Sequence, residues 1–408
     1  MGFTVEQKCP QCGAPIELEE TDRLLRCPYC DVENYIFAPG HFRFVLPNKA
    51  YGKEIIYAPY LRFKGNVYFC QGQTIGYRIV DITRIGLPFK GIPVSLGLRP
   101  QAMKMKFMTG DTKGSFLEFS LKAKDIISNA ARLSSALSTG KIFHRAYIGE
   151  ALSIIYLPLF VNNDRLFDAI LNRPIYSLTR GQDISESTIK KKPQWKIHFV
   201  ATLCPQCGWN LEGERDSVVL NCNNCDSAWE VSKGKFVRVN LLFVEGRDKD
   251  TLYLPFWKMY AKVKGLEINS YGDFMRQTNQ PRMAQKEWKN QAMCFWSPAF
   301  KIKPKVFLRL SSQITVSQID FKAKGTIHGK NLYPVTLPGT EAIQALKLVL
   351  AGSAVNKKKI LPLLPSIIFD IKESTLVYLP FTDTGHEMIQ QHIGISINKN
   401  TLNYGRYL

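Results

Sequence analysis

The sequence predicts a β-rich α+β fold in which a unit of about 200 residues is repeated in tandem. Two observations predict the repeat: a four-cysteine cluster occurs twice, and the same landmarks follow each cluster in the same order. A third observation, that aromatic and β-branched runs outnumber helical stretches, predicts mostly antiparallel β-structure with one or more helices per unit. With 408 residues, the chain also exceeds what one hydrophobic core usually holds.

The two cysteine clusters share one spacing. In each, two C-x2-C knuckles are separated by fourteen residues, as expected when four thiolates converge on one metal ion. Soft thiolates suit zinc, with iron as the alternative. Four thiolates leave no position for a reactive water, so we expect two structural Zn²⁺ sites and no hydrolytic centre. The predicted metal ligands are Cys9, Cys12, Cys27 and Cys30 in the first cluster and Cys204, Cys207, Cys222 and Cys225 in the second.

These clusters resemble the zinc-ribbon superfamily, whose members serve transcription, translation and replication machinery and act as adaptor proteins. The resemblance is carried by the eight cysteines, covers about 22 residues in each half, and implies a bound zinc ion in a small β-hairpin fold. The Cys-Pro-x-Cys-Gly form also resembles the mononuclear iron site of rubredoxins. Between the first two knuckles, residues 16–19 and 24–26 flank a polar turn and predict a short hairpin.

The remainder of the first half reads as strands followed by a helix and a final strand. Helical spacing of apolar residues between positions 121 and 137, with Asp125 near the start, predicts the helix. The runs that predict strands are residues 34–46, 55–80 and 153–160.

The second half repeats these landmarks with similar separations. Counting the cysteine clusters, five landmarks recur in the same order, which is difficult to produce by chance and therefore indicates a duplication. Residues 251–259 match 55–63, residues 297–309 echo 87–99, residues 341–347 echo the predicted helix, and residues 375–381 match 154–160.

A shorter pattern, Tyr-x-Pro, occurs twice in each half, beginning at Tyr57, Tyr156, Tyr253 and Tyr378. Because proline has no N–H for a sheet ladder, each copy predicts a strand end or an edge. Aliphatic residues precede every copy, so we expect these tyrosines in the core; the alternative is an aromatic platform that stacks bases.

Together these features divide the chain into five segments. A polar stretch that contains Lys190-Lys191-Lys192-Pro193 has little to bury and predicts a linker between the halves. The predicted segments are zinc ribbon 1 (1–37), a β-rich α+β domain (38–181), the linker (182–195), zinc ribbon 2 (196–232) and a second β-rich α+β domain (233–408).

The formal net charge of +20 favours an anionic partner. Two four-thiolate sites, each contributing −4 + 2 = −2, would reduce it to about +16. Lysines alternate with apolar residues at 103–107 and at 301–306. On strands they would form two related basic strips that could follow a phosphate backbone. The alternative is that they are solvated lysines of edge strands that discourage aggregation. The predicted polyanion-binding residues are Lys104, Lys106, Lys301, Lys303 and Lys305.

On these grounds we expect a non-enzymatic zinc-binding protein that binds a polyanion, with nucleic acid as the first candidate. The alternative is a protein–protein scaffold subunit of a larger assembly, including an assembly at a membrane face. No catalytic motif is present, and an enzyme would require a site assembled from distant residues, such as a cleft between the halves. Cys70 and Cys294 follow or precede aromatic residues and are expected to be buried. No apolar run is long enough to cross a bilayer, and the metal-binding thiols indicate a cytoplasmic protein.

Overall fold

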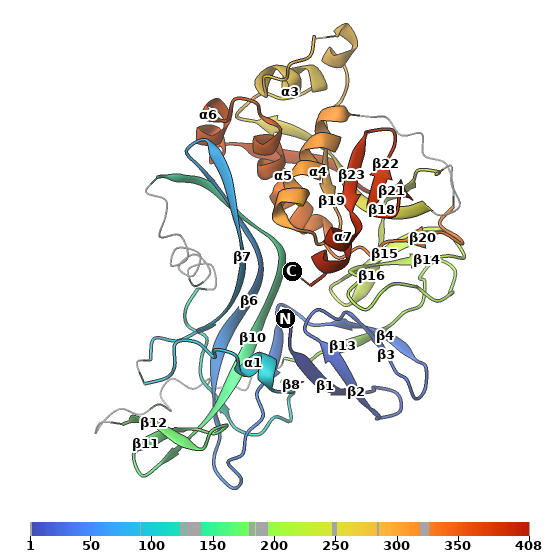
Figure 1. Cartoon of the computed structure of the whole chain (residues 1–408). Coiled ribbons are helices and arrows are strands. Elements are labelled where there is room, and N and C mark those ends of the chain that lie inside the picture. The colour runs from blue at the N-terminus through green and yellow to red at the C-terminus, as the bar shows by residue number, and fades with distance from the viewer. Residues whose placement is uncertain are drawn as a thin grey trace.

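The computed structural model describes residues 2–89, 91–122, 126, 140–178, 184, 195–246, 251–283, 285–318 and 326–407. It confirms the β-rich α+β prediction (Figure 1). Each half contains one large sheet built on a pair of long antiparallel strands. The first hairpin of the first cysteine-containing segment (residues 4–19) continues the first large sheet, and the other cysteine-containing strands form two small sheets near both chain termini.

The sheet of the first half is organised around the antiparallel pair β6 (Ile56–Gln71) and β10 (Ile142–Asn162). On the outer side of β6, β9 (Ser115–Phe116) pairs in parallel and β7 (Thr74–Ile85) pairs in antiparallel orientation. On the outer side of β10, β5 pairs in parallel and β11 in antiparallel orientation. The remaining bounds are β5 (Phe42–Val45), β8 (Met105–Phe107), β11 (Arg165–Asp168) and β12 (Arg173–Ser177).

The sheet of the second half repeats this connectivity. Its central pair is β18 (Thr251–Lys264) with β21 (Ile368–Asp383), and their outer neighbours have the same directions as those of β6 and β10. Strands β20 and β19 correspond to β9 and β7, and β17 and β22 correspond to β5 and β11. The structure thus confirms a duplicated architecture. The bounds are β17 (Leu241–Phe243), β19 (Cys294–Pro298), β20 (Asn331–Leu332), β22 (Glu387–Gln390) and β23 (Ile395–Asn398).

The Tyr-x-Pro motifs lie inside the long strands, so the expectation of strand ends or edges is wrong. Within each half the two motifs face each other, with each tyrosine opposite the other motif's proline. At Pro59 the outer neighbour of β6 changes from β9 to β7, and Gly86 N donates to Pro59 O from that side. The proline nitrogen, which has no hydrogen, faces the break between β9 and β7, so no ladder hydrogen bond is lost. The tyrosines are buried, as expected.

Two helices of the second half join the large sheets. Helices α4 (Pro304–Ser317) and α5 (Gly339–Ser353) pack on each other and on β19, and α5 also contacts β10 of the first half (Figure 1). Tyr68 and Ile148 of the first half belong to the core of the second half, so this apolar core crosses the boundary between the halves. The other helices are α1 (Arg99–Ala102), α3 (Tyr271–Gln277), η2 (Lys286–Lys289), α6 (Lys357–Ile360), η3 (Leu361–Leu363) and α7 (Lys399–Gly405).

The helix predicted at residues 341–347 is confirmed within α5. The helix predicted at residues 121–137 lies outside the described residues except at 121, 122 and 126, where Ile126 is buried. Most of the predicted linker also lies outside them. Ile184 and Trp195, near its two ends, are buried in the core of the first half.

The two cysteine-containing segments, ribbon 1 (residues 4–37) and ribbon 2 (residues 198–239), share a sheet. Strand β13 of ribbon 2 pairs with β4 of ribbon 1, so the sheet order is β13-β4-β3. The hairpin predicted between the knuckles is wrong: β2 and β3 belong to different sheets, and each knuckle forms the turn of its own hairpin. The division into five segments stays a prediction. The bounds are β1 (Thr4–Lys8), β2 (Pro15–Glu19), β3 (Leu24–Arg26), β4 (Glu33–Phe37), β13 (His198–Ala201), β14 (Val219–Cys222), β15 (Ser227–Ser232) and β16 (Lys235–Val239).

Candidate metal centres

Each cysteine tetrad brings its four sulfur atoms within 4.8 Å of one another. In ribbon 1, Cys9 Sγ lies 3.7 Å from Cys30 Sγ, and Cys12 Sγ lies 3.6 Å from Cys27 Sγ. The corresponding distances in ribbon 2 are 3.6 and 3.4 Å. Sulfurs around zinc at about 2.3 Å form a tetrahedron with edges of about 3.8 Å, whereas a disulfide bond measures about 2.05 Å. The sulfur spacing therefore fits a metal ion such as zinc.

The knuckle backbones explain how the sulfurs converge. The residue after the second cysteine has a left-handed conformation in all four knuckles, with φ of 76° at Gly13, 57° at Asp31, 75° at Gly208 and 49° at Asp226. In the first knuckle, Gly13 N donates to Cys9 O at 3.0 Å and closes the turn. Glycine and aspartate tolerate this conformation better than most residues, so the sequence favours the turn.

The second metal centre contributes to the contact between the ribbons. Cys204 and Cys222 are buried in a small apolar cluster with Leu24 and Tyr35 of ribbon 1 and Trp229 of ribbon 2. Backbone hydrogen bonds from residues 23 and 24 to the carbonyl of residue 215, at 2.6 and 2.9 Å, reinforce this contact. The metal ligands of ribbon 2 therefore help to hold ribbon 1.

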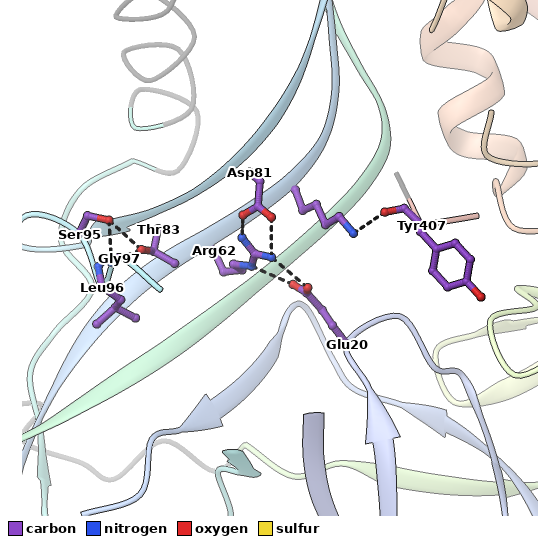
Figure 2. A network of polar contacts seen from close by, with 9 residues as sticks. Glu20, Arg62, Asp81, Thr83, Ser95, Leu96, Gly97 and Tyr407 are labelled. Carbon is purple, nitrogen blue, oxygen red and sulfur yellow. Dashed lines mark hydrogen bonds and ion pairs between the residues drawn. The ribbon is translucent and has the colours of Figure 1, made fainter. Parts of the chain in front are cut away.

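A buried ion pair fastens ribbon 1 to the first large sheet (Figure 2). Arg62 of β6 donates through Nε and Nη2 to the two carboxylate oxygens of Glu20, both at 3.1 Å, and its Nη1 donates to Asp81. Both Arg62 and Glu20 are nearly inaccessible to solvent, with side-chain exposures of 1% and 2%. On the same strand, Lys64 Nζ donates to Tyr407 O at 2.7 Å and joins the first half to the C-terminal segment.

Ribbon 2 is held by the second half. Asn221, next to the metal ligand Cys222, donates to the Tyr378 hydroxyl at 3.1 Å. Val218 N donates to Val335 O at 2.8 Å. These bonds connect the second metal centre to the strand β21 and to the segment before α5.

A further polar contact crosses between the halves at α5. The Glu341 carboxylate, in the first turn of this helix, accepts a hydrogen bond from Gly149 N at a bulge in β10. Burial raises the pKa of Glu341 to about 7, although this hydrogen bond and the charge of Lys301 oppose the shift. Glu341 is thus a structural clasp that loses its proton near neutral pH.

The Glu341 clasp makes stability depend on pH. A carboxyl group whose pKa rises from 4.5 to about 7 on folding stabilises the fold most below pH 4.5, and this advantage is lost as the pH rises through 7. We expect wild type to lose on the order of 3 kcal/mol more than Glu341→Gln between pH 5 and pH 8. Urea unfolding of metal-loaded protein at each pH measures the difference. Exposed Glu118→Gln is the control and should follow wild type, and parallel curves for wild type and Glu341→Gln would contradict the role of Glu341.

The five predicted polyanion-binding lysines do not form matching strips. Lys104 pairs with Glu17, and Lys106 of β8 lies 3.8 Å from a Glu6 carboxylate oxygen. Lys301 is half-buried between the halves, whereas Lys303 and Lys305 are exposed at the start of α4. The strand expected at 301–306 is wrong because Pro304 occupies the first turn of this helix, where its missing N–H costs nothing.

The two remaining cysteines are buried, as predicted, with exposures of 0% at Cys70 and 6% at Cys294. Burial raises the pKa of Cys70 to about 12, which argues against a reactive thiolate. Among the described residues, no helix combines the length and apolarity that a membrane span requires.

Comparisons with protein-family models, with curated proteins and with solved structures found no match to this chain.

The sequence reasoning missed the groups that lock the ribbons in place. Glu20 lies in a stretch that was interpreted as a polar turn, and Arg62 lies in a predicted buried strand. A charged residue inside a strand that is otherwise apolar is itself a signal, because such a charge requires a partner. Nothing in the sequence near Arg62 indicates that its partner is Glu20.

Proposed function

We propose that this protein is a two-unit binding protein, stabilised by two Zn²⁺ ions, that engages a polyanion, with nucleic acid as the first candidate. The observation that carries the proposal is a basic end formed by residues 271–290 and 353–366. A reducing compartment such as the cytoplasm suits its eight metal-binding thiols.

The basic end is assembled from two segments of the second half. Val355 N donates to Thr278 O at 3.0 Å, and Gln280 donates to Ser353 O, so the segment that follows α3 is bonded to the segment between α5 and α6, at the end of the molecule where Figure 1 labels both α3 and α6. These segments carry seven arginines and lysines and two acidic residues, Asp273 and Glu287, a net charge of +7 − 2 = +5. The basic residues are Arg276, Arg282, Lys286, Lys289, Lys357, Lys358 and Lys359.

Most of these side chains are free to meet a ligand. Arg276 forms an ion pair with Asp273, Lys357 donates to Ala354 O, and Arg282 lies against the Tyr271 hydroxyl. The other four, Lys286, Lys289, Lys358 and Lys359, are exposed. Such a surface suits a phosphate backbone, which is recognised mainly by charge and releases counterions on binding. Lys104 and Lys106 are each already paired with a glutamate, so we do not expect them to contribute to binding.

The test is the salt dependence of binding to single-stranded and duplex DNA and RNA, followed by fluorescence anisotropy. Binding should be measurable at 50 mM salt and weaken steeply towards 200 mM. The triple variant Lys357→Gln, Lys358→Gln and Lys359→Gln should reduce the slope of log K against log salt by about 2 to 3. The control is Lys104→Gln with Lys106→Gln, which should bind like wild type. No binding at 50 mM salt would refute the proposal.

A protein scaffold is the second candidate, favoured by apolar side chains exposed at the knuckles. Tyr29 is 69% exposed between Cys27 and Cys30, and Trp209 is 58% exposed just after the Cys207 knuckle. Exposed aromatic residues often anchor protein partners. A stoichiometric partner that is recovered after nuclease treatment, and lost from Trp209→Ser, would favour the scaffold over the polyanion binder.

A further inference from the structure

A polar cavity lies where the two ribbons meet both large sheets. Its volume is about 230 Å³. Its lining comes from ribbon 1, ribbon 2, strand β10, the segments that precede α4 and α5, and the first turn of α5. The cavity therefore exists only when both halves are assembled. Its charged lining residues are Arg23, Glu150, Asp216, Glu230, Lys301 and Glu341.

Within the described part of the chain, five of these six charges have no ion pair. Asp216 is paired with Arg406, whereas no oppositely charged side chain of the described residues lies within 4 Å of the other five. Glu341 is held by Gly149 N. Arg23 is fixed through Nη1, which donates to two backbone carbonyls at 3.2 and 3.5 Å, and its guanidinium stacks on Phe42 at 4.8 Å. Unpaired charges of both signs thus face one cavity.

The surroundings of these side chains disfavour their charged forms. Burial raises the pKa of Glu150, Glu230 and Glu341. Burial also lowers the pKa of Lys301; the charge of Glu341 opposes this shift, whereas Arg23 and Lys64 add to it. Each shift means that the environment compensates the charged form less well than water does. A ligand that supplied opposite charges would remove this penalty.

The pattern of charges restricts the class of ligand. Among the described residues, groups close enough to hold a metal ion occur only at the cysteine tetrads, so the carboxylates are not arranged for a metal. A simple anion would meet Glu150 and Glu230, and a simple cation would meet Arg23 and Lys301. A ligand that carries one positive and one negative group can pair with the carboxylates and with the basic side chains at the same time.

The size and surroundings of the cavity define the rest of the ligand. Its volume of about 230 Å³ is below the roughly 300–1,000 Å³ of pockets for drug-sized ligands. A neighbouring cavity of about 260 Å³ shares Arg23, Tyr35 and Glu150 with it and is also lined by Phe37 and Phe42. An apolar side chain on the ligand could therefore pack against these aromatic rings, next to the charged groups.

We propose that this cavity binds a small zwitterion of the amino-acid type with an apolar side chain. Its carboxylate is bound by Arg23 and Lys301, and its ammonium group is bound by Glu150 and Glu230.

The test is calorimetric titration of the metal-loaded full chain with L-leucine and L-phenylalanine. The matched probes are 4-methylpentanoate, which is leucine without its amine, and 3-methylbutylamine, which is leucine without its carboxylate. At least one amino acid should bind, and for leucine each matched probe should bind at least about tenfold more weakly, because charges that are half-buried in the cavity then stay unpaired. Arg23→Gln and Glu230→Gln should each weaken amino-acid binding at least about tenfold.

Two controls separate this proposal from the function proposed above. Lys358→Gln, at the basic end, should bind amino acids like wild type. Each cavity variant should keep two metal ions and its circular dichroism spectrum, so that lost binding reports the cavity and not misfolding; two independent variants guard against a folding defect in one. The proposal is overturned if neither amino acid binds, if the single-charge probes bind equally well, or if both folded variants bind like wild type.

Discussion

Replacing Cys222 by serine should release one metal ion per chain and lower the melting temperature by more than about 10 °C. Structural zinc contributes about 10–16 kcal/mol in isolated zinc-finger peptides, comparable to the whole stability of a domain. Cys222 is fully buried in the cluster that joins the two ribbons. Loss of its thiolate therefore removes a metal ligand and also weakens the contact with ribbon 1.

The effect should extend beyond ribbon 2. Strand β13 pairs with β4, and Asn221 is bonded to Tyr378, so an unfolded ribbon 2 would leave an edge of ribbon 1 and part of β21 unsupported. We expect limited proteolysis to cut both ribbons in Cys222→Ser. Metal content by mass spectrometry and melting by circular dichroism measure the primary effect.

Cys70→Ala is the matched control, because Cys70 is equally buried but belongs to neither tetrad. It should keep two metal ions and lose about 1 kcal/mol from the small cavity that it creates. A Cys222→Ser protein that retained two metal ions, or melted like wild type, would show that the four-thiolate site is not what holds the ribbons.

Local sequence patterns predicted the metal ligands and the duplication, because both leave a signal within a few residues. A C-x2-C knuckle brings two sulfurs together whatever surrounds it, and the two Tyr-x-Pro landmarks of each half lie on corresponding strands, β6 with β18 and β10 with β21. The Tyr-x-Pro motif was predicted to lie where the proline has no strand to donate to, which is correct, but the predicted place, a strand end or an edge, is wrong. Beside Pro59 the neighbouring strand changes from β9 to β7, so the proline lies within a strand and no strand waits for its missing N–H.

The contacts between distant segments had no such signal. Glu20 and Arg62 are 42 residues apart, and Gly149 and Glu341 are 192 apart. Neither pair follows from spacing, because each depends on how the ribbons dock on the sheets. The pairing of β13 with β4 is also non-local, and it makes the two ribbons one structural unit although the chain between them is long.

Replacing Arg62 by methionine should destabilise the protein by about 3–5 kcal/mol. The substitution preserves an unbranched apolar stem but removes the guanidinium that satisfies both oxygens of Glu20. Glu20 is 2% exposed and would remain as a buried charge without compensation. The loss should separate ribbon 1 from β6, because this ion pair joins them.

A double-mutant cycle separates the burial cost from the value of the pair. Arg62→Met combined with Glu20→Gln removes both charges and should recover most of the loss, since neutralised buried pairs are often near neutral for stability. Lys104→Met is the exposed control: its partner Glu17 is 59% exposed and should be satisfied by water, at a cost below about 1 kcal/mol. The single variant Glu20→Gln completes the cycle, and urea unfolding at pH 7 measures all four variants against wild type. If Arg62→Met cost no more than Lys104→Met, water would have to reach Glu20 in the variant. Ribbon 1 would then be held chiefly by its strand pairing with β8 and β13.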